Sequence, residues 1–484
     1  MSAGKLPEGW VIAPVSTVTT LIRGVTYKKE QAINYLKDDY LPLIRANNIQ
    51  NGKFDTTDLV FVPKNLVKES QKISPEDIVI AMSSGSKSVV GKSAHQHLPF
   101  ECSFGAFCGV LRPEKLIFSG FIAHFTKSSL YRNKISSLSA GANINNIKPA
   151  SFDLINIPIP PLAEQKIIAE KLDTLLAQVD STKARFEQIP QILKRFRQAV
   201  LGGAVNGKLT EKWRNFEPQH SVFKKLNFES ILTELRNGLS SKPNESGVGH
   251  PILRISSVRA GHVDQNDIRF LECSESELNR HKLQDGDLLF TRYNGSLEFV
   301  GVCGLLKKLQ HQNLLYPDKL IRARLTKDAL PEYIEIFFSS PSARNAMMNC
   351  VKTTSGQKGI SGKDIKSQVV LLPPVKEQAE IVRRVEQLFA YADTIEKQVN
   401  NALARVNNLT QSILAKAFRG ELTAQWRAEN PDLISGENSA AALLEKIKAE
   451  RAALAGVKKP HVKNPEHYFL AHLSGALFII SRQS

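Results

Sequence analysis

One segment of the chain comes close to a nucleotide-binding motif. Residues 202–209 read Gly-Gly-Ala-Val-Asn-Gly-Lys-Leu, which nearly fits the GxxxxGK[ST] loop that cradles phosphates. Leu209 stands where the motif needs a magnesium-binding hydroxyl, and the segment follows a long helical pattern where a strand is required. We therefore interpret it as a helix terminus. The alternative, a P-loop enzyme, predicts that Lys208→Ala abolishes nucleotide binding.

Other catalytic and metal-binding patterns are missing from the sequence. It contains no HExxH or GxSxG motif and no Asn-Pro-Pro-Tyr or Asp-Pro-Pro-Tyr string of an amino-methyltransferase, and His95 and His97 have no third ligand nearby. The five cysteines form no CxxC pair, which argues against a zinc ribbon or a disulfide framework and favours a reducing compartment. We therefore expect no active site, no metal and no bound cofactor in this chain.

The charge balance points to a polyanionic partner. Lys and Arg number 64 against 47 Asp and Glu, which gives a formal net charge of +17. No apolar run is long enough to cross a membrane, and the first residues lack the apolar core of a signal peptide, so we expect a cytoplasmic protein. A length of 484 residues corresponds to several domains.

Polar and basic residues gather in short loops that follow apolar runs. Residues 59–62, 78–81 and 287–290 are apolar runs bounded by Gly, Ser, Asn and Pro, which predicts short strands. The polar segments 83–88 and 291–296 follow directly after two of them. These stretches are expected to form strand-rich α+β modules.

An internal repeat organises the chain. Pro158 to Arg214 aligns without a gap on Leu371 to Arg427, at an offset of 213 residues. A weaker match precedes each copy, in which Arg45 aligns with Arg254 and Asp77 with Asp287. The chain therefore contains two diverged modules, each followed by a better-matched copy of one helical segment.

Each helical segment carries apolar residues at alternating steps of four and three, which is typical of a coiled-coil seam. The seam residues are Ile168, Leu172, Leu175, Val179, Phe186 and Leu193 in the first copy, and Ile381, Val385, Leu388, Ile395, Val399 and Val406 in the second, which continues to Leu409 and Ile413. The two helices should pair with each other, most simply antiparallel; two separate bundles are the alternative. Pro190 should kink or break the first helix, and Gly207 and Gly420 stand where C-terminal caps are wanted.

These strings resemble the specificity subunits of type I restriction–modification enzymes. The resemblance covers roughly residues 1 to 455. It rests on Leu6-Pro7-Glu8-Gly9-Trp10, on Pro160-Pro161-Leu162-Ala163-Glu164-Gln165 with Leu209-Thr210 and Trp213-Arg214, and on their echoes Pro373-Pro374-Val375-Lys376-Glu377-Gln378, Leu422-Thr423 and Trp426-Arg427.

The resemblance implies an α+β protein with two target-recognition domains separated by two long helices that pair as an antiparallel coiled coil, with a pseudo-twofold internal repeat. The expected boundaries are 1–153 and 215–366 for the two recognition domains, 154–214 and 367–430 for the helical spacer repeats, and 431–484 for a C-terminal helix and tail. The tail from about Ala455 does not fit the family pattern, and we interpret roughly the last 30 residues as an extension that lies outside the functional argument.

The resemblance also implies a non-catalytic subunit. Each recognition domain would read one half of a bipartite, asymmetric duplex DNA target, and the coiled coil would set the unread spacer. The chain would dock two methyltransferase subunits and, through the complex, two restriction subunits, which carry S-adenosylmethionine, ATP and Mg²⁺. A basic scaffold that binds nucleic acid without sequence preference is the alternative.

Arg and Asn can make bidentate contacts to base edges, so polar and basic loop residues of the two modules are the candidate DNA contacts. In the first module these are Tyr27, Lys28, Asn47, Asn48, Ser84, Ser86, Lys87, Asn143 and Asn145; in the second they are Ser241, Lys242, Ser256, Arg259, Arg292, Tyr293, Asn294 and Lys358. A solvated loop residue is the alternative for each. Arg45 and Arg254 recur in both modules, so we interpret them as scaffold or phosphate contacts.

Overall fold

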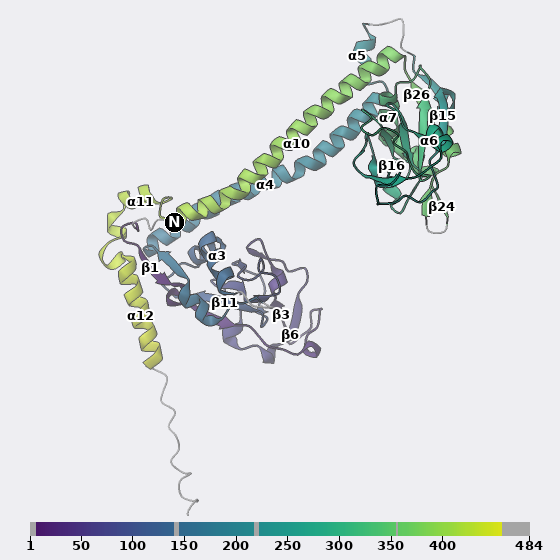
Figure 1. The fold of residues 1–484 in the computed structure, drawn as a ribbon. Helices are drawn as coiled ribbons and strands as arrows, with labels where there is room; N and C mark the ends of the chain where they lie inside the picture. The colour runs from purple at the N-terminus through teal and green to yellow at the C-terminus, as the bar shows by residue number, and fades with distance from the viewer. Residues whose placement is uncertain (1–5, 140–144, 217–221, 355–356, 457–484) are drawn as a thin grey trace, which may run out of the picture. The chain divides into compact units, whose positions relative to one another are not determined.

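The computed structural model describes residues 6–139, 145–216, 222–354 and 357–456 (Figure 1). The chain divides into two compact units, residues 1–182 with 405–484, and residues 183–404. Asn143, a predicted DNA contact, and the C-terminal tail, interpreted above as an extension, lie outside the described residues.

The module of the first unit is built on a four-stranded antiparallel sheet. Its order is β2 (Thr19–Arg23), β11 (Cys108–Pro113), β7 (Ile78–Ala81), β9 (Ser93–Ala94). A three-stranded sheet follows the order β10 (Ser103–Phe104), β3 (Tyr40–Ile44), β6 (Val60–Pro63). The helices α2 (Ser119–Lys127) and α3 (Ser129–Leu138) pack on the four-stranded sheet in one core. The predicted strands at 59–62 and 78–81 are confirmed as β6 and β7.

The second unit repeats this plan. Its sheet has the order β15 (Leu232–Asn237), β23 (Leu320–Leu325), β20 (Leu288–Thr291), β22 (Cys303–Leu305), and its paired helices are α7 (Pro331–Ser339) and α8 (Pro341–Asn349). The remaining strands include β16 (His250–Leu253), β19 (Ile268–Leu271), β21 (Tyr293–Asn294), β24 (Lys352–Thr354) and β25 (Gln357–Gly359). The short helix α6 (Glu275–His281) follows β19, and α9 (Gly362–Lys366) follows β25. The predicted strand at 287–290 is confirmed as β20, and the α+β class holds for both units.

A two-stranded antiparallel ribbon joins each module to a long helix. In the first unit β1 (Val11–Pro14) pairs with β13 (Asn156–Ile159), and in the second β14 (Lys224–Asn227) pairs with β26 (Val369–Leu372). Directly after β13 and β26, a Pro-Pro step leads into α4 (Leu162–Val205) and α10 (Val375–Phe418), each 44 residues long.

The two long helices pair antiparallel, as predicted. In the first unit the start of α4 shares a core with the end of α10, where Leu172 and Phe418 are buried together. In the second unit the end of α4 meets the start of α10, where Val200 and Ile381 share another core. Figure 1 shows α4 and α10 running side by side. The alternative of two separate bundles is therefore excluded.

Burial along both helices follows the predicted seam. The six seam residues of α4 and the six of α10 are all buried or half-buried. The extension of the seam to Leu409 is wrong, because its side chain is 47% exposed. Pro190 does not break α4, which is helical on both sides of it. Pro190 is exposed, so water can reach the carbonyl that loses its helical partner there.

The predicted glycine caps are confirmed at both helix ends. Gly207 follows α4 with a φ of +78°, and Gly420 follows α10 with a φ of +74°. Residues with a Cβ rarely adopt this left-handed conformation, whereas glycine does so at little cost. The segment that resembles a phosphate-binding loop therefore forms the end of α4.

A buried glutamate closes each end of the helix pair. Glu164, near the start of α4, accepts hydrogen bonds from Trp10 Nε1 at 2.8 Å, from the Thr423 hydroxyl at 2.6 Å and from the Arg427 guanidinium. We call this group the Glu164 closure. The Glu of one repeat copy thus binds the Thr and Arg of the other copy.

The second unit has a matching closure around Glu377. Its carboxylate accepts from the Thr210 hydroxyl at 2.6 Å and from Arg214 Nη1 at 2.5 Å. In both closures the Arg also donates to the carbonyl of the helix-capping glycine, Arg214 to Gly207 at 2.5 Å. The matching sequence strings therefore have one structural role in both copies.

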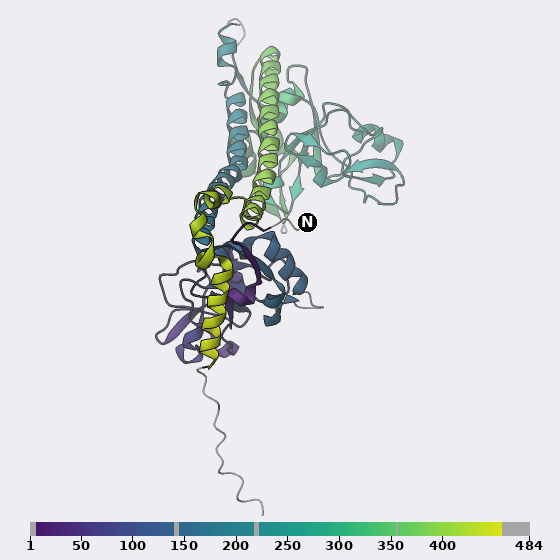
Figure 2. The ribbon, with the colours of Figure 1, turned by 90° about the vertical axis from the view of Figure 1, so that its left-hand side faces the viewer.

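A C-terminal helix belongs to the first unit. After α11 (Ala424–Glu429), α12 (Ala440–Gly456) places Leu443 and Ile447 in the core of the first module. Arg451 donates to the carbonyl of Ser16 at 2.8 Å and pairs with Glu114. Figure 2 shows α12 lying along this module. Strands near the N-terminus and a helix near the other end of the described chain thus share one core.

An Asp–Arg pair fixes the sheet of each module at the same place. Asp287 accepts two hydrogen bonds from Arg324, at 2.7 and 3.1 Å, and the equivalent Asp77 accepts two from Arg112, at 2.7 and 2.6 Å. Both aspartates are almost fully buried, so the bidentate partner offsets the cost of burying their charge. The aligned aspartates of the repeat are therefore structural.

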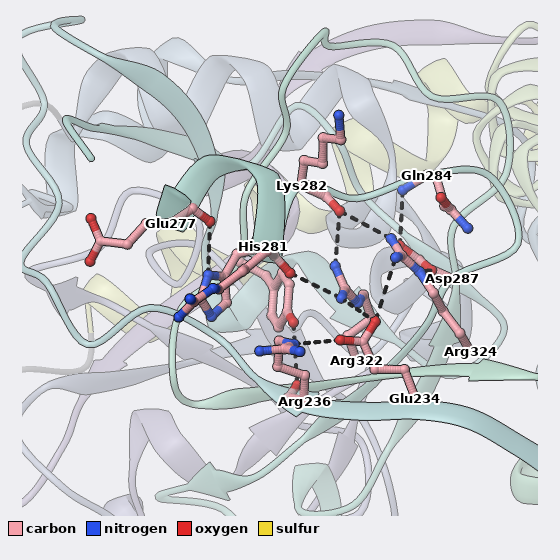
Figure 3. A network of polar contacts seen from close by, with 11 residues as sticks. Glu234, Arg236, Glu277, His281, Lys282, Gln284, Asp287, Arg322 and Arg324 are labelled. Atoms are coloured by element: carbon pink, nitrogen blue, oxygen red, sulfur yellow. Dashed lines mark hydrogen bonds and ion pairs between the residues drawn. The ribbon is translucent and has the colours of Figure 1, made fainter. Parts of the chain in front are cut away.

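The second module adds an arginine that the first lacks (Figure 3). Arg322 is 1% exposed, donates to Glu234 at 2.7 Å and lies over the ring of Tyr316. Glu234 also accepts from Arg236. The strand register places Val110 of the first module where the second has Arg322. The same sheet position is thus apolar in one module and charged in the other.

The five cysteines should differ sharply in reactivity. Burial raises the pKa of Cys102 and Cys108 to about 12 and raises the pKa of Cys303 well above its ordinary value, whereas Cys273 and Cys350 are partly exposed. Because the thiolate is the nucleophile, iodoacetamide at pH 8 is expected to label Cys273 and Cys350 first. Mass spectrometry of the native protein measures this, with the urea-unfolded protein as control. Labelling of Cys108 as fast as Cys350 would contradict it.

Candidate nucleic-acid interface

An open cleft lies at the same place in the fold of each module. The first cleft has a volume of about 950 Å³ and the second about 760 Å³. Equivalent segments line both, namely the loop after the first sheet strand, the turn after β3 or β16, and the loop after β7 or β20. The side chains differ: the first cleft has Tyr27, Arg45, Asn47, Ser83 and Phe107, and the second has Ser241, Arg254, Ser256, Tyr293 and Lys319.

The backbone frame of the two clefts is the same. The carbonyl of Phe107 accepts from Met82 N at 2.8 Å, and the carbonyl of Lys319 accepts from Arg292 N at 2.8 Å. These bonds tie the last turn before β11 or β23 to the loop that follows β7 or β20. Phe107 and Lys319 therefore occupy equivalent positions at the cleft.

A glycine lets two segments approach closely beneath each cleft. A Cβ on Gly24 would lie 2.1 Å from the carbonyl oxygen of Gly105, and a Cβ on Gly238 would lie 2.2 Å from that of Tyr316. Any larger residue would push apart the two segments that line the cleft. The frame thus requires glycine at both positions, while the lining residues differ between the two clefts.

Arg45 and Arg254 are the basic residues that both clefts share. Arg45 donates to the Asp58 carboxylate at 2.8 Å, and Arg254 lies 3.7 Å from the Asp267 carboxylate. Each carboxylate orients its guanidinium at the cleft wall. Their interpretation as scaffold or phosphate contacts stays a prediction.

Several predicted contact residues come together in the clefts. In the first module Tyr27 and Asn47 line the cleft; in the second module Ser241, Lys242, Ser256, Arg259, Tyr293 and Asn294 do so. Arg259 stacks over the Phe299 ring at 5.3 Å from its centroid, which holds the guanidinium in place. The second cleft thereby gathers most of its predicted residues, and the first gathers few.

A second group of predicted residues lies on short strands after the sheet. In the first module Ser84 of β8 (Ser83–Ser84) pairs with Asn145 of β12 (Asn145–Asn146). In the second, Asn294 pairs with Lys358. Asn145 is buried, whereas Ser86 and Lys87 are exposed in the loop after β8, where the Ser86 hydroxyl lies 2.9 Å from that of Ser88.

The other three predicted residues are Asn48, Lys28 and Arg292. Asn48 is 1% exposed, and its amide donates to the carbonyls of Asp55 and Asp58, both at 2.9 Å, so its donors are already used. Lys28 is exposed beside Tyr27. Arg292 lies over the Tyr293 ring at 4.7 Å from its centroid, next to the second cleft.

Sequence reasoning missed further cleft residues. Phe107 and Tyr35 line the first cleft, and Arg269 and Lys319 line the second. Phe107 stands in a mostly apolar stretch, so its residue type predicts a core side chain, yet it is 70% exposed. Arg269 lies on β19 and Lys319 in the turn before β23, and neither place carries a sequence signal for a cleft.

The two clefts differ strongly in charge. Lys242, Arg254, Arg259, Arg269 and Lys319 bring five cationic side chains to the second cleft, against Lys29 and Arg45 in the first. Within the described ranges, no group of three or more His, Cys, Asp or Glu could hold a metal ion. None of the helices in that part of the chain is long and apolar enough to cross a membrane.

Relatives of known type share this sequence over most of its length. The family model "Type I restriction modification DNA specificity domain" matches residues 7–191 and 308–405. The EcoKI specificity subunit of Escherichia coli K12 is 98% identical over 464 residues, covering 96% of this chain and 100% of the relative. The StySPI specificity subunit of Salmonella potsdam is 66% identical, again over 96% of this chain and 100% of the relative.

Solved structures share the fold at low sequence identity. A chain from a type I R-M system has a TM-score of 0.61 at 17% identity, over 86% of this chain and 100% of that chain. The HsdS subunit from Thermoanaerobacter tengcongensis has a TM-score of 0.53 at 16% identity, over 87% of this chain and 99% of that chain. The chain belongs to the family of type I restriction-enzyme specificity subunits, and is thus a DNA-recognition subunit and not an enzyme.

Proposed function

We propose that the two clefts read the two halves of a bipartite, asymmetric DNA target. The observation that carries this proposal is that one backbone frame holds two clefts with different linings. Side chains that meet base edges choose the sequence, whereas phosphate contacts position the protein. Two clefts with different side chains would therefore select two different half-targets.

The long helices would set the length of the unread spacer. A 44-residue helix is about 66 Å long at 1.5 Å per residue. Half-targets one helical turn apart are about 34 Å apart along the duplex, well within that length. A packed seam holds its length better than a flexible linker, so the spacing between half-targets would be constant.

The same helices would dock the partner subunits. We propose that two methyltransferase subunits bind the outer faces of the helix pair and the adjoining repeat ends, and that two restriction subunits join through the complex. Large apolar side chains exposed on these helices support this, since Ile192, Tyr391 and Leu409 are 56%, 64% and 47% exposed. S-adenosylmethionine, ATP and Mg²⁺ would belong to those partners, and the complex would act on DNA in the cytoplasm.

A module exchange tests the reading of half-targets. Residues 1–153 are replaced by the matching module of a related specificity subunit, and the chimera is mixed with the modification subunit. Selection from a random duplex library is expected to yield a target in which one half changes, while the other half and the spacer stay fixed. Exchange of residues 215–366 is the matched control and should change the other half.

Two results would count against the proposal. If one exchange changed both halves or neither, the modules would not read half-targets independently. If the unaltered chain bound in a salt-sensitive way without enriching any sequence, it would be a nonspecific basic scaffold, because phosphate contacts alone give affinity with a steep salt dependence.

A further inference from the structure

Phe107 is a large apolar side chain held in the open on a fixed backbone. It is 70% exposed, on the turn between β10 and β11. Its carbonyl accepts hydrogen bonds from Met82 N at 2.8 Å and Ser83 N at 3.2 Å, and Cys108 N closes the turn on Gly105 at 2.8 Å. The ring is therefore presented by a rigid turn, in contrast to an aromatic residue on a free loop.

Phe107 does not stand alone. Tyr27 and Tyr35 line the same cleft, and Tyr35 is 60% exposed. Single exposed apolar residues are common on protein surfaces, but three aromatic side chains that line one cleft offer several flat faces for stacking. Arg45 and Asn47 stand on the same cleft, where they can meet an anionic or hydrogen-bonding group.

This combination fits a nucleobase better than a peptide or a lipid. A base offers a flat aromatic face to stack on, polar edges for an amide and a nearby phosphate for a guanidinium. The equivalent position in the second cleft carries Lys319, which is exposed and has no flat surface. A lysine at that place suits a phosphate, so equivalent positions of the two clefts carry different chemistry.

We propose that Phe107 stacks on a base of the first half-target that has left its place in the duplex stack. The inference rests on the proposed function and goes one step beyond it, since reading base edges does not require unstacking. Apolar wedges that separate a base step bend the duplex and increase the contact with the protein. The second module, with Lys319, would leave its half-target stacked.

The test uses the full chain in complex with its modification subunit and the duplex obtained by library selection. 2-Aminopurine, whose fluorescence rises on unstacking, replaces one base at a time in each half-target. Phe107→Ala, Phe107→Lys and Phe107→Tyr are compared with the wild type, and Lys319→Ala serves as the matched control. Circular dichroism verifies that these exposed substitutions leave the fold intact.

At one or more positions in the first half-target, 2-aminopurine fluorescence is expected to rise when the wild type or Phe107→Tyr binds. At the same positions it should not rise with Phe107→Ala or Phe107→Lys. Affinity should fall about 5- to 150-fold in Phe107→Ala, as expected for one lost base–aromatic stack. Lys319→Ala should leave this fluorescence increase unchanged and reduce the salt dependence of binding by about one released counterion.

If the partner subunits unstack a base, 2-aminopurine at that position should become fluorescent with every variant. Only a fluorescence increase that is lost in Phe107→Ala therefore supports stacking on Phe107. If no position depends on Phe107, the stacking inference is wrong while the half-target proposal stands. If the library yields no bipartite target at all, the half-target proposal itself fails.

Discussion

Replacing Glu164 with alanine is expected to lower the free energy of unfolding of the first unit by about 3–5 kcal/mol, the usual cost of breaking a buried ion pair. The Glu164 carboxylate is fully buried and accepts from Trp10, Thr423 and Arg427. Without this carboxylate, the Arg427 guanidinium, whose side chain is only 12% exposed, loses its partner. Trp10 Nε1 and the Thr423 hydroxyl also lose their acceptor. Urea unfolding followed by circular dichroism measures the effect.

The same helix offers a matched control for this variant. Glu170 is exposed on α4, so Glu170→Ala should change the free energy of unfolding by less than about 0.5 kcal/mol. Glu164→Gln keeps one acceptor oxygen and should cost less than Glu164→Ala. A loss below about 1 kcal/mol in Glu164→Ala would mean that the closure contributes little to holding the helix ends together.

The second large effect concerns the buried Arg322. Replacing Glu234 with threonine, the residue that the register places there in the first module (Thr20), is expected to destabilise the second unit by about 3 kcal/mol. The reason is that Arg322 remains buried without its carboxylate partner. Adding Arg322→Val, which copies Val110 of the first module, should recover at least half of that loss. A double-mutant cycle in urea measures both steps.

The pH dependence gives this cycle an independent readout. Burial favours the neutral form of Glu234, but the hydrogen bond from Arg236 and the charge of Arg322 outweigh it and lower its pKa from the ordinary 4.5. A lowered pKa adds stability that is present above pH 4.5 and is lost as the pH falls through the folded-state value. The stability difference between the wild type and Glu234→Thr should therefore shrink in acid; a constant difference would contradict the pairing.

The helical part of the fold could be predicted from the sequence because its determinants are local and periodic. Apolar residues such as Leu172 and Val385 recur at steps of three and four, and the repeat doubles the signal. Leu409 shows where prediction from the period fails, since the period places it in the seam and the structure leaves it exposed. The predicted break at Pro190 fails for another reason, because a solvent-facing proline can stay within a helix that its neighbours hold in place.

The candidate interface could be predicted only in outline. Polar loops after apolar strands indicated the region, and in the second module they indicated most of the cleft. In the first module Asn48 and Asn145 prove to be buried, because an amide suits a turn or a strand pair as well as a ligand. Phe107 was missed because its exposure depends on the tertiary contacts that fix its turn.

The helix α12 has a consequence for the order in which the protein folds during synthesis. The first unit combines the beginning of the chain with residues beyond 404, whereas the second unit is one continuous stretch. Leu443 and Ile447, which complete the first core, leave the ribosome after every residue of the second unit. The unit synthesised first must therefore wait, with apolar surface uncovered, while the second can complete its own core. The N-terminal module, although it is synthesised first, is therefore the last part of the protein to complete its folded core.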